Sequence, residues 1–355
     1  MRVVILGAGN VGALVAHDLS KDFEVWVADK DHARLSRVSR VAEVVTLDAS
    51  KPESVSELVR GFDLVVNALP GFLGFRALKA SLQAKRDTVD VSFMPEDPLH
   101  LNAEVSRLGI KVVVDAGFAP GLSNILVGHI YNKLGPMDEG VINVGGLPKE
   151  PRPPLYHQVL FSPYDLIDEY LRPARCVVEG RVVDVDPLQR IESVRVGNFI
   201  FERFISDGLR TLLTTVKARN MAEYTLRWPR HLERMKTLKE LGFFRKEFLE
   251  HTIKVILPAM QYDSPDFSIM EVYGRKDDVT LGYYMYDEAS SGFTSMSRVT
   301  GFMTAIITRL VARGNIAPGV IPPEYLGMDD RNLEYVLSEL RKRGVTIEST
   351  SLRNT

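Results

Sequence analysis

The stretch that decides the fold is residues 3–12, VVILGAGNVG, in which apolar, strand-favouring residues lead directly into a Gly-x-Gly-x-x-Gly turn. A strand without polar residues is typical of a parallel sheet that is covered on both faces. After the turn, apolar residues recur at helical spacing at positions 11, 14, 15 and 19. The order of strand, glycine turn and helix predicts the phosphate-binding unit of a dinucleotide-binding domain.

Each glycine of this turn has a physical role. Gly7 permits the tight turn, Gly9 lets the backbone approach a pyrophosphate without an intervening Cβ, and Gly12 lets the helix pack close to the strand. The amide groups and the dipole at the start of the helix are expected to face the phosphates. Asn10 and Val11 lie at this start and are therefore among the predicted contacts. We therefore predict that these five residues bind a dinucleotide.

The next strand, residues 24–28, ends at Asp29, about 20 residues beyond the turn, where a carboxylate can accept hydrogen bonds from the adenosine ribose. Lys30 and Arg34 lie close by in the sequence and are suited to a 2′-phosphate. Because Asp29 would repel that phosphate, we predict NAD as the cofactor, with NADP the less favoured alternative. Asp48, at the end of the following strand, is expected to reach the adenine.

Length and composition narrow the functions further. The chain has 355 residues, more than a single core comfortably holds, which predicts two domains. Its 44 basic and 46 acidic residues give a formal net charge of −2 without a run of like charge, so we expect neither nucleic acid nor a membrane as partner. Cys176 is the only cysteine and the 7 histidines lack ligand spacing, so we expect neither a disulfide nor a metal site. Without a signal-peptide h-region or a long apolar run, the protein is expected to be cytoplasmic.

Strands and helices alternate from residue 3 to residue 115, giving six predicted strands and five crossovers. Right-handed crossovers make such an alternation an α/β fold, a Rossmann-type doubly wound parallel sheet. Ligands of these sheets bind beyond the carboxyl ends of the strands, where residues 67–71, 90–93 and 115–124 are expected. The predicted cofactor contacts at this edge are Asn67, Ala68, Leu69, Pro70, Ser92 and Gly117.

The pattern changes beyond about residue 122, where short strands, interspersed helices and a proline-rich loop at residues 148–154 replace the regular alternation. We interpret residues 122–295 as an inserted α+β domain for substrate binding and dimerisation. A long predicted helix over residues 297–313 begins a segment that is expected to pack back on the first domain. The NAD-binding Rossmann domain would thus comprise residues 1–121 plus 296–355.

Four motifs occur in collinear order: DVSFMPED at 90–97, GFAPGLSN at 117–124, TLRWP at 225–229 followed by His231, and SMSRVTGF at 295–302. Together they resemble the saccharopine dehydrogenase-like family over essentially the whole chain. Within that family the chain is most similar to members that oxidise the side-chain amine of L-lysine. The resemblance implies a nicotinamide-binding domain completed by the C-terminal segment, and an inserted domain that forms a homodimer.

The chain departs from the family pattern in places. The saccharopine reductase branch has Asp where this chain has Ala119 and Tyr at the position of Asp90, and both differences argue against saccharopine as the substrate. Arg230 replaces a glycine in the pattern that leads to His231. If that glycine serves a tight turn, the replacement affects where the histidine lies.

The candidate catalytic residues are Asp90 and His231. Asp90 ends a buried strand and is predicted to attract a cationic amine, while His231 is predicted to accept its proton or, alternatively, only to begin a helix. Arg227 is predicted to bind the carboxylate of an amino acid with its planar fork, the alternative being a surface arginine. Desolvation by Phe118 and Trp228 would help to lower the pKa of the amine. The other predicted substrate contacts are Tyr156, Ser297 and Thr300.

These expectations favour an NAD-dependent enzyme that oxidises the side-chain amine of L-lysine to the aldehyde, which cyclises to piperideine carboxylate, and releases ammonia. A reductase of the same family that joins an amine and a carbonyl, of the saccharopine or carboxynorspermidine type, is the enzyme alternative. A non-catalytic nucleotide-sensing protein is a weaker alternative, because a switch has little need of a large second domain. His157, after the proline-rich loop, is interpreted as structural or gating.

Overall fold

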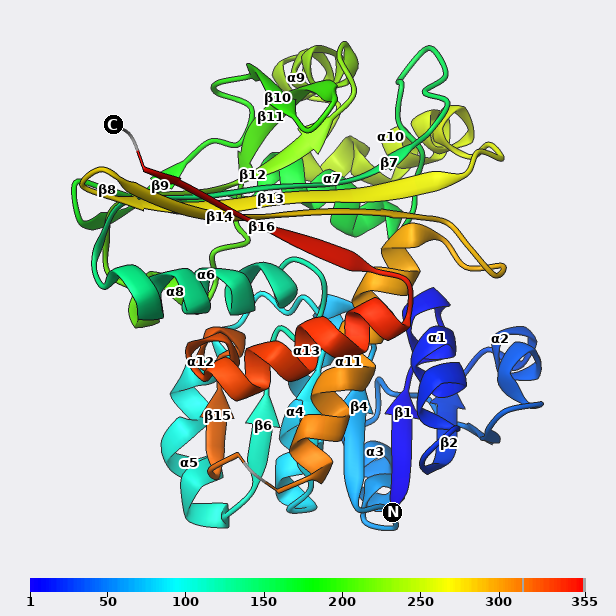
Figure 1. Ribbon diagram of the computed structural model, residues 1–355. Helices are drawn as coiled ribbons and strands as arrows, with labels where there is room; N and C mark the ends of the chain where they lie inside the picture. Colours follow the sequence, from blue (N-terminus) through cyan, green and yellow to red (C-terminus); the bar gives the residue numbers. More distant parts are fainter. Residues whose placement is uncertain (315, 354–355) are drawn as a thin grey trace. The chain divides into compact units, whose positions relative to one another are not determined.

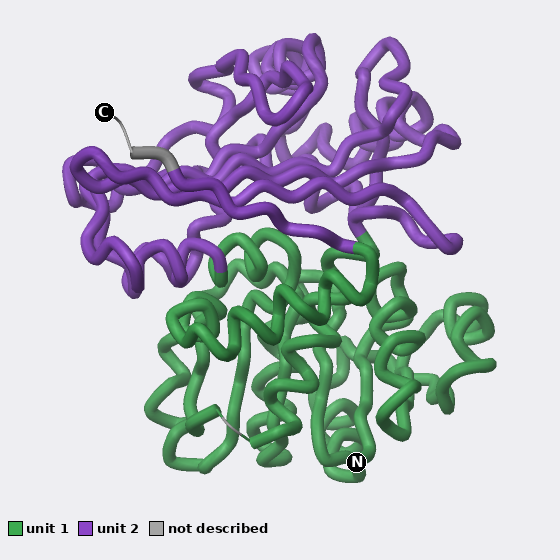
Figure 2. Tube along the Cα trace, viewed as in Figure 1, with its two compact units in different colours: residues 1–125, 297–344 green, residues 126–296, 345–355 purple. Residues whose placement is uncertain are grey.

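The structure, a computed structural model, describes residues 1–314 and 316–353. It divides into two compact units: unit 1 comprises residues 1–125 and 297–344, and unit 2 comprises residues 126–296 and 345–355 (Figure 2). The first two boundaries fall within helices α6 (Leu122–Leu134) and α11 (Ser295–Ala312), near the expected ones. The third differs from the expectation, because the chain beyond residue 344 belongs to unit 2 and not to the Rossmann-type domain.

Unit 1 contains a parallel sheet of seven strands in the order β15-β6-β5-β4-β1-β2-β3 (Figure 1). The strand order reverses between β1 and β4, as it does in a doubly wound fold, and this confirms the predicted α/β class. The sequence predicted one strand fewer, because the last one comes from the C-terminal segment. The strands are β1 Arg2–Leu6, β2 Glu24–Asp29, β3 Glu43–Thr46, β4 Leu64–Asn67, β5 Asp87–Asp90, β6 Lys111–Val113 and β15 Gly319–Ile321.

Successive side chains of β1 point to opposite faces of this sheet, and both sets are buried. Val4 and Leu6 pack in one core cluster with Val55 of α3 and Ala77 of α4, while Ile5 points to the other face, and all of these side chains are fully buried. The helices of unit 1 are α1 Asn10–Leu19, α2 His32–Val38, α3 Pro52–Val59, α4 Gly71–Gln83, η1 Pro98–Leu101, α5 Asn102–Leu108, α12 Pro323–Met328 and α13 Asp330–Lys342, together with most of α11.

An ionic cluster ties the C-terminal helices of unit 1 to α1. Asp18 of α1 is 2% exposed and accepts hydrogen bonds from Arg309 of α11 at 2.5 Å and from Arg343 at 2.7 Å. Arg309 also pairs with Asp22, and Arg343 pairs with Glu339 of α13. The helix that follows the glycine turn is thereby held by residues about 300 positions away in the sequence.

Unit 2 is built on a mixed sheet of nine strands, whose main path runs β10-β11-β12-β7-β13-β14-β16 and from which the β8–β9 hairpin branches at β12. The C-terminal strand β16 is antiparallel to β14, which explains why the end of the chain belongs to this unit. The strands are β7 Met137–Pro148, β8 Ala174–Val178, β9 Arg181–Val185, β10 Glu192–Val196, β11 Phe199–Ser206, β12 Ala218–Arg227, β13 Asp266–Lys276, β14 Val279–Glu288 and β16 Thr346–Arg353.

The helices of unit 2 pack into a core of their own. Leu166 and Tyr170 of one helix and Leu232 and Met235 of another meet Phe204 of the sheet in one hydrophobic cluster. Besides α6, the helices are α7 Pro163–Leu171, α8 Leu212–Thr215, α9 His231–Glu240, α10 Lys246–Ile256 and η2 Leu257–Met260. Within the described residues, no helix combines the length and the apolar character that crossing a membrane would require.

Candidate functional site

The glycine turn of unit 1 has the form of a phosphate cradle. A Cβ on Gly7 would lie 2.6 Å from the carbonyl oxygen of Ala68, and one on Gly12 would lie 2.0 Å from that of Gly7. A Cβ on Gly9, in contrast, would meet no atom within 4 Å. Helix α1 begins just after Gly9 without a side-chain cap and without an acid in its first turn. The open space and the uncapped amides fit a pyrophosphate.

Asp29 joins the end of β2 to this turn. Its Oδ2 accepts a hydrogen bond from the Ala8 amide at 2.7 Å, and its Oδ1 accepts one from the Asp31 amide at 2.9 Å. Each oxygen keeps a second lone pair, so the carboxylate can still accept hydrogen bonds from a ribose. Arg37, an exposed side chain that the sequence analysis did not single out, donates to Asn10 of the turn at 3.4 Å.

Asp48 has a local role. It follows β3 and accepts hydrogen bonds from the hydroxyl of Ser50 at 2.7 Å and from the amide of Ser50 at 3.1 Å. These hydrogen bonds from Ser50 lower the pKa of the Asp48 carboxyl. The carboxylate thus stabilises the turn before α3, and its contact with an adenine stays a prediction.

A buried polar cluster lies at the carboxyl ends of β4 and β5, where Asn67 and Asp90 are directly opposite each other. Asp90 is fully buried, and its Oδ1 accepts hydrogen bonds from the amide and the hydroxyl of Ser92 at 2.9 and 2.8 Å. Its Oδ2 accepts from the side-chain amide of Asn67, which also donates to the carbonyl of Gly74 at 3.0 Å. Burial raises the pKa of Asp90 to about 8, and the nearby carboxylate of Asp115 raises it too.

The chain becomes accessible just beyond this cluster. Ala68 and Leu69 are half-buried and Pro70 is exposed. This placement at the strand ends fits their predicted role as cofactor contacts, because ligands of doubly wound sheets bind at this edge.

The loop after β6 is folded tightly against the same edge. Gly117 bridges to Gly121, whose φ of +134° is a conformation that side chains rarely adopt, and the amide of Gly121 donates to Asn124 at 3.1 Å. A Cβ on Gly117 would lie 3.4 Å from Thr300 of α11. The structure therefore brings Gly117 and Thr300 together, while Phe118, at 3% exposure, and Ser297, also at 3%, are buried.

In unit 2, Arg227 ends β12 and is 2% exposed, so it is not a surface arginine. Its Nη2 donates to Glu169 at 2.6 Å, its Nε to the hydroxyl of Tyr170 at 3.0 Å, and its Nη1 to the carbonyl of Leu226 at 3.0 Å. Each guanidinium nitrogen already has a partner within the protein. The carboxylate that Arg227 meets here is that of Glu169 on α7, and the binding of a substrate carboxylate stays a prediction.

His231, the first residue of α9, is fully buried and uses both ring nitrogens. Nδ1 lies 2.6 Å from the carbonyl of Leu155, which can only accept, so Nδ1 carries the proton and Nε2 accepts from the hydroxyl of Tyr170 at 2.9 Å. Burial and the charge of Arg227 lower the pKa of His231 to about 3. The ring is therefore neutral at physiological pH, and this arrangement offers no support for the predicted proton acceptance.

The replacement of glycine by Arg230 has not removed the turn before His231. Arg230 keeps a φ of +79°, the left-handed conformation that favours glycine. Its guanidinium donates to the hydroxyl of Tyr156 at 3.4 Å. Trp228 packs 5.1 Å from Phe201 between ring centroids and donates to the carbonyl of Pro148 at 2.8 Å.

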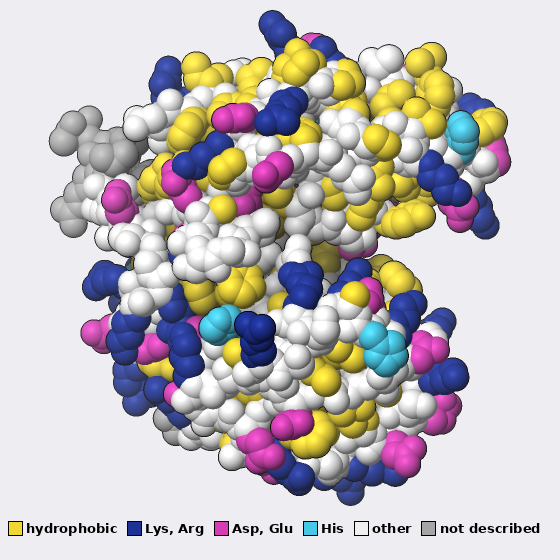
Figure 3. Space-filling view, turned by 90° about the vertical axis from the view of Figure 1, so that its right-hand side faces the viewer, with side chains coloured by type: hydrophobic (Ala, Val, Ile, Leu, Met, Phe, Trp, Pro, Cys, Tyr) yellow, Lys and Arg dark blue, Asp and Glu magenta, His cyan; other side chains and the backbone are white. Residues whose placement is uncertain are grey.

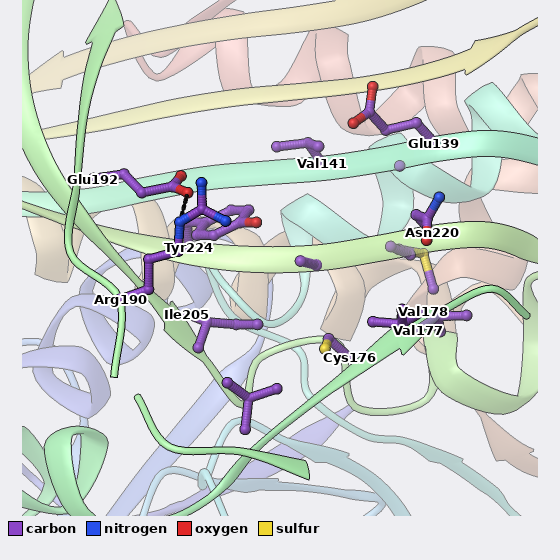
Figure 4. A pocket seen from close by; sticks show the side chains of 14 residues that line it. Glu139, Val141, Cys176, Val177, Val178, Arg190, Glu192, Ile205, Asn220 and Tyr224 are labelled. Carbon is purple, nitrogen blue, oxygen red and sulfur yellow. Dashed lines mark ion pairs between the residues drawn. The ribbon is translucent and has the colours of Figure 1, made fainter. Parts of the chain in front are cut away.

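A cavity of about 320 Å³ lies on the sheet of unit 2, between β7, β11, β12 and the β8–β9 hairpin (Figure 4). Valine side chains and Cys176 form much of its wall, and Glu139, Glu192 and Tyr224 also line it. Glu192 is already paired with Arg190 at 2.6 Å and with Arg203 at 2.7 Å. Its lining contains none of the predicted substrate residues, and no sequence pattern indicated this cavity.

Two features of the described residues concern nucleic acids and metal ions as ligands. Acidic and basic side chains are interspersed over the face seen in Figure 3. Within residues 1–314 and 316–353, no group of three or more His, Cys, Asp or Glu side chains is placed to hold a metal ion.

Comparison with known families agrees with the resemblance seen in the motifs. The model of the saccharopine dehydrogenase C-terminal domain matches residues 117–345, and that of the saccharopine dehydrogenase NADP binding domain matches residues 3–113. The chain belongs to the saccharopine dehydrogenase family. The second match and the cradle at Gly9 together indicate a nicotinamide dinucleotide as cofactor.

Individual relatives are distant. Carboxyaminopropylagmatine dehydrogenase from Synechocystis sp. is 21% identical over 361 residues, which cover 88% of this chain and 89% of that protein. Mitochondrial alpha-aminoadipic semialdehyde synthase from Rattus norvegicus is 27% identical over 195 residues, and this match spans only 21% of the relative's length and 52% of this chain. Apo saccharopine dehydrogenase (L-Glu forming) from Saccharomyces cerevisiae has the same fold, with a TM-score of 0.81 and 18% identity over 99% of both chains.

Proposed function

We propose that the chain is a nicotinamide-dependent oxidoreductase of the L-lysine 6-dehydrogenase type. It would oxidise the side-chain amine of L-lysine to the aldehyde, which cyclises to piperideine carboxylate, and release ammonia. The observation that carries this proposal is the buried carboxyl of Asp90, hydrogen-bonded to Asn67 and Ser92 at the ends of β4 and β5. The saccharopine reductase branch has a tyrosine at this position instead.

The chemistry requires a proton acceptor. A lysine ammonium has a free pKa of about 10.4 and cannot give up hydride until it is deprotonated. Bound nicotinamide supplies the hydride acceptor at C4. Asp90, with its pKa raised to about 8, titrates close to the operating pH, as an efficient general base should. The proton would pass from the amine to Asp90, and water would then hydrolyse the imine to aldehyde and ammonia.

This assignment changes the role expected for His231. We infer that Asp90 accepts the proton and that His231 has a structural role, because burial keeps the His231 ring neutral and both of its nitrogens are occupied. The hydrogen bonds from Ser92 to Asp90 favour the ionised carboxylate once it forms. NAD is the proposed cofactor, a small amino acid the proposed substrate, and a homodimer through unit 2 the proposed assembly.

A second function is favoured by one observation. Carboxyaminopropylagmatine dehydrogenase aligns with nearly the whole chain. The alternative is therefore a reductase that joins an amine and a carbonyl.

The absorbance of the reduced cofactor separates these functions. Reduction of NAD by L-lysine alone supports the proposal, whereas oxidation of NADH or NADPH only when an amine and a keto acid are both present supports the joining reductase. Cofactor binding without turnover on a panel of amines and keto acids would instead indicate the nucleotide sensor.

The role of Asp90 predicts a specific pH profile. Because the base must be ionised, kcat of the wild type should rise as the pH passes about 8. Asp90→Asn should lower kcat by about 10²- to 10⁴-fold and remove this limb, since an amide cannot accept the proton. Glu96→Gln, at an exposed acid of the same motif, is the matched control and should keep the limb. A limb that survives in Asp90→Asn would contradict the assignment.

A further inference from the structure

Three exposed basic side chains, Lys30, Arg34 and Arg37, follow β2 in unit 1. Two of them face acids. The Nε of Arg34 lies 3.4 Å from the carboxylate of Asp31. The pKa of the Asp48 carboxyl is lowered by hydrogen bonds from the serine two residues further on and, to a smaller extent, by the charge of Lys30, which therefore lies near that carboxylate. Arg37 alone of the three has no acidic partner among the described residues.

Arg37 contacts the glycine turn instead. It lies in the last turn of α2, and its Nη2 donates to the side-chain oxygen of Asn10, the first residue of α1, at 3.4 Å. A guanidinium has five N–H groups, so one long hydrogen bond leaves the others for a further acceptor. The end of α2 favours a basic residue through its helix dipole, but this does not explain why the side chain turns towards α1.

The start of α1 is an unfavourable place for a cation unless an anion is also present. The helix dipole gives this end a partial positive charge, its amides have no side-chain cap, and its first turn contains no acid. Arg37 brings a full positive charge to the same point, and like charges repel. An anion beside them relieves this repulsion, and the open space at Gly9, where a Cβ would meet no atom within 4 Å, can hold one.

We propose that Arg37 binds the pyrophosphate of the nicotinamide dinucleotide, together with the amides at the start of α1. The planar guanidinium can donate to two phosphate oxygens at once. The 2′-phosphate of NADP is the other phosphate that Arg37 could meet. The contact with Asn10 favours the pyrophosphate, because Asn10 belongs to the cradle, whereas the ribose is expected at Asp29. The inference rests on the nicotinamide cofactor of the proposed function and not on its substrate.

Arg37→Gln tests this by removing the charge and the fork while keeping a polar side chain. The Kd values of the full chain for NADH, NADPH and ADP-ribose, measured by calorimetry without substrate, should rise by the same factor, about three- to thirtyfold. The Kd for adenosine, which has no phosphate, should not change. The difference between variant and wild type should shrink at high salt, because exposed charges are screened. Arg40→Gln removes the same charge from an exposed arginine just after α2, and this matched control should keep the wild-type affinities.

The remaining outcomes overturn the inference or separate it from the proposed function. A higher Kd for NADPH alone overturns it, because Arg37 would then meet the 2′-phosphate. Unchanged Kd values for NADH and ADP-ribose overturn it as well, and so does an equal loss for adenosine, which would mean that the substitution disturbs the turn. If the wild type binds neither NADH nor NADPH, the inference and the proposed cofactor fail together. If it binds them and Arg37→Gln weakens both, the role of Arg37 stands even when lysine is not oxidised.

Discussion

The three glycines of the turn differ in what surrounds them, and this difference can be measured. Gly12 faces the backbone oxygen of Gly7, whereas Gly9 faces open space at a φ of −66°, which any residue can adopt. A methyl group at residue 12 would have to displace backbone, while one at residue 9 would displace only a ligand.

Gly12→Ala should therefore lower the free energy of unfolding by about 1–3 kcal/mol in a urea titration, the range for overpacking. Gly9→Ala should leave the free energy of unfolding unchanged and weaken NADH binding by at least about tenfold, since the methyl group takes the space of the pyrophosphate. Wild-type affinity in Gly9→Ala would mean that the phosphates lie elsewhere.

Asp29 decides the preference between the two nicotinamide cofactors. Asp29→Ala should raise the ratio of kcat/KM with NADP to that with NAD, because the charge that repels a 2′-phosphate is lost. Asp29→Asn is the control for the hydrogen bond from the Ala8 amide, since it removes the charge and keeps an acceptor. Equal use of NAD and NADP by the wild type would contradict the preference, and Arg34 and Arg37 would then be the next residues to replace.

Local rules were enough to predict where the glycine turn, Asp29 and the strand ends lie in the fold, because each depends on a few neighbours in the chain. The partners of Arg227 and His231 could not be predicted in this way. Glu169 is 58 residues from Arg227, and Leu155 is 76 residues from His231, so tertiary packing alone selects them. An arginine at the end of a buried strand indicates that an ion pair forms, but the local sequence does not identify the carboxylate that takes part in it.

At the scale of elements, the link from α1 to α11 and α13 depends on one carboxylate. Burial by itself raises the pKa of Asp18, but hydrogen bonds and charges from Arg343 and Arg309 outweigh it and leave the pKa lowered. A carboxyl whose pKa is lower in the folded state adds stability above its unfolded pKa of about 3.9, and that stability is lost as the pH falls through the folded pKa.

Asp18→Asn should accordingly lower the free energy of unfolding by about 3–5 kcal/mol at pH 7, because two arginines lose their shared buried partner. The difference between variant and wild type should shrink as the pH falls below about 4. Asp22→Asn is the matched control with a smaller effect, because the Asp22 side chain is 51% exposed and that of Asp18 1%. A loss for Asp18→Asn no larger than that for Asp22→Asn would contradict this account.

The elements that the sequence did not reveal are those whose pairing is remote. β15 has three residues, too few for a periodic signal, and its partner β6 precedes it by about 200 positions. Most helices and strands of the first 115 residues were foreseen because apolar runs and helical periods alternate there in a regular order, in which even the short β6 has an expected place.

At the scale of the molecule, the return of the chain to unit 2 has a measurable effect. Residues 346–353 cover the outer edge of β14 from Val279 to Tyr286, most of its length. Removing residues 345–355 should expose a long strand edge, so amide exchange of β14 should speed up and the shortened chain should self-associate. Exchange in β1 of unit 1 is the internal control and should keep its wild-type rate. Unchanged exchange in β14 would show that β16 adds no protection.

The sequence predicted the existence of two units because its rhythm of elements changes near residue 122. It did not predict that the last strand would leave the first unit, since the pattern of a strand does not say which sheet the strand joins. Only the pairing with β14 settles the assignment.

The three boundaries between the units also affect how the protein is made. Neither unit is a continuous stretch of chain, because the polypeptide leaves unit 1 after residue 125, returns at residue 297 and leaves again after residue 344. On the ribosome, the sheet of unit 1 stays without its outermost strand until Ile321 has been added, by which time most of unit 2 has already emerged. Domains that are continuous can fold one after another as they are synthesised. In this chain both must wait, because β15 and β16, each at the edge of its sheet, are synthesised after all the other strands of the described residues.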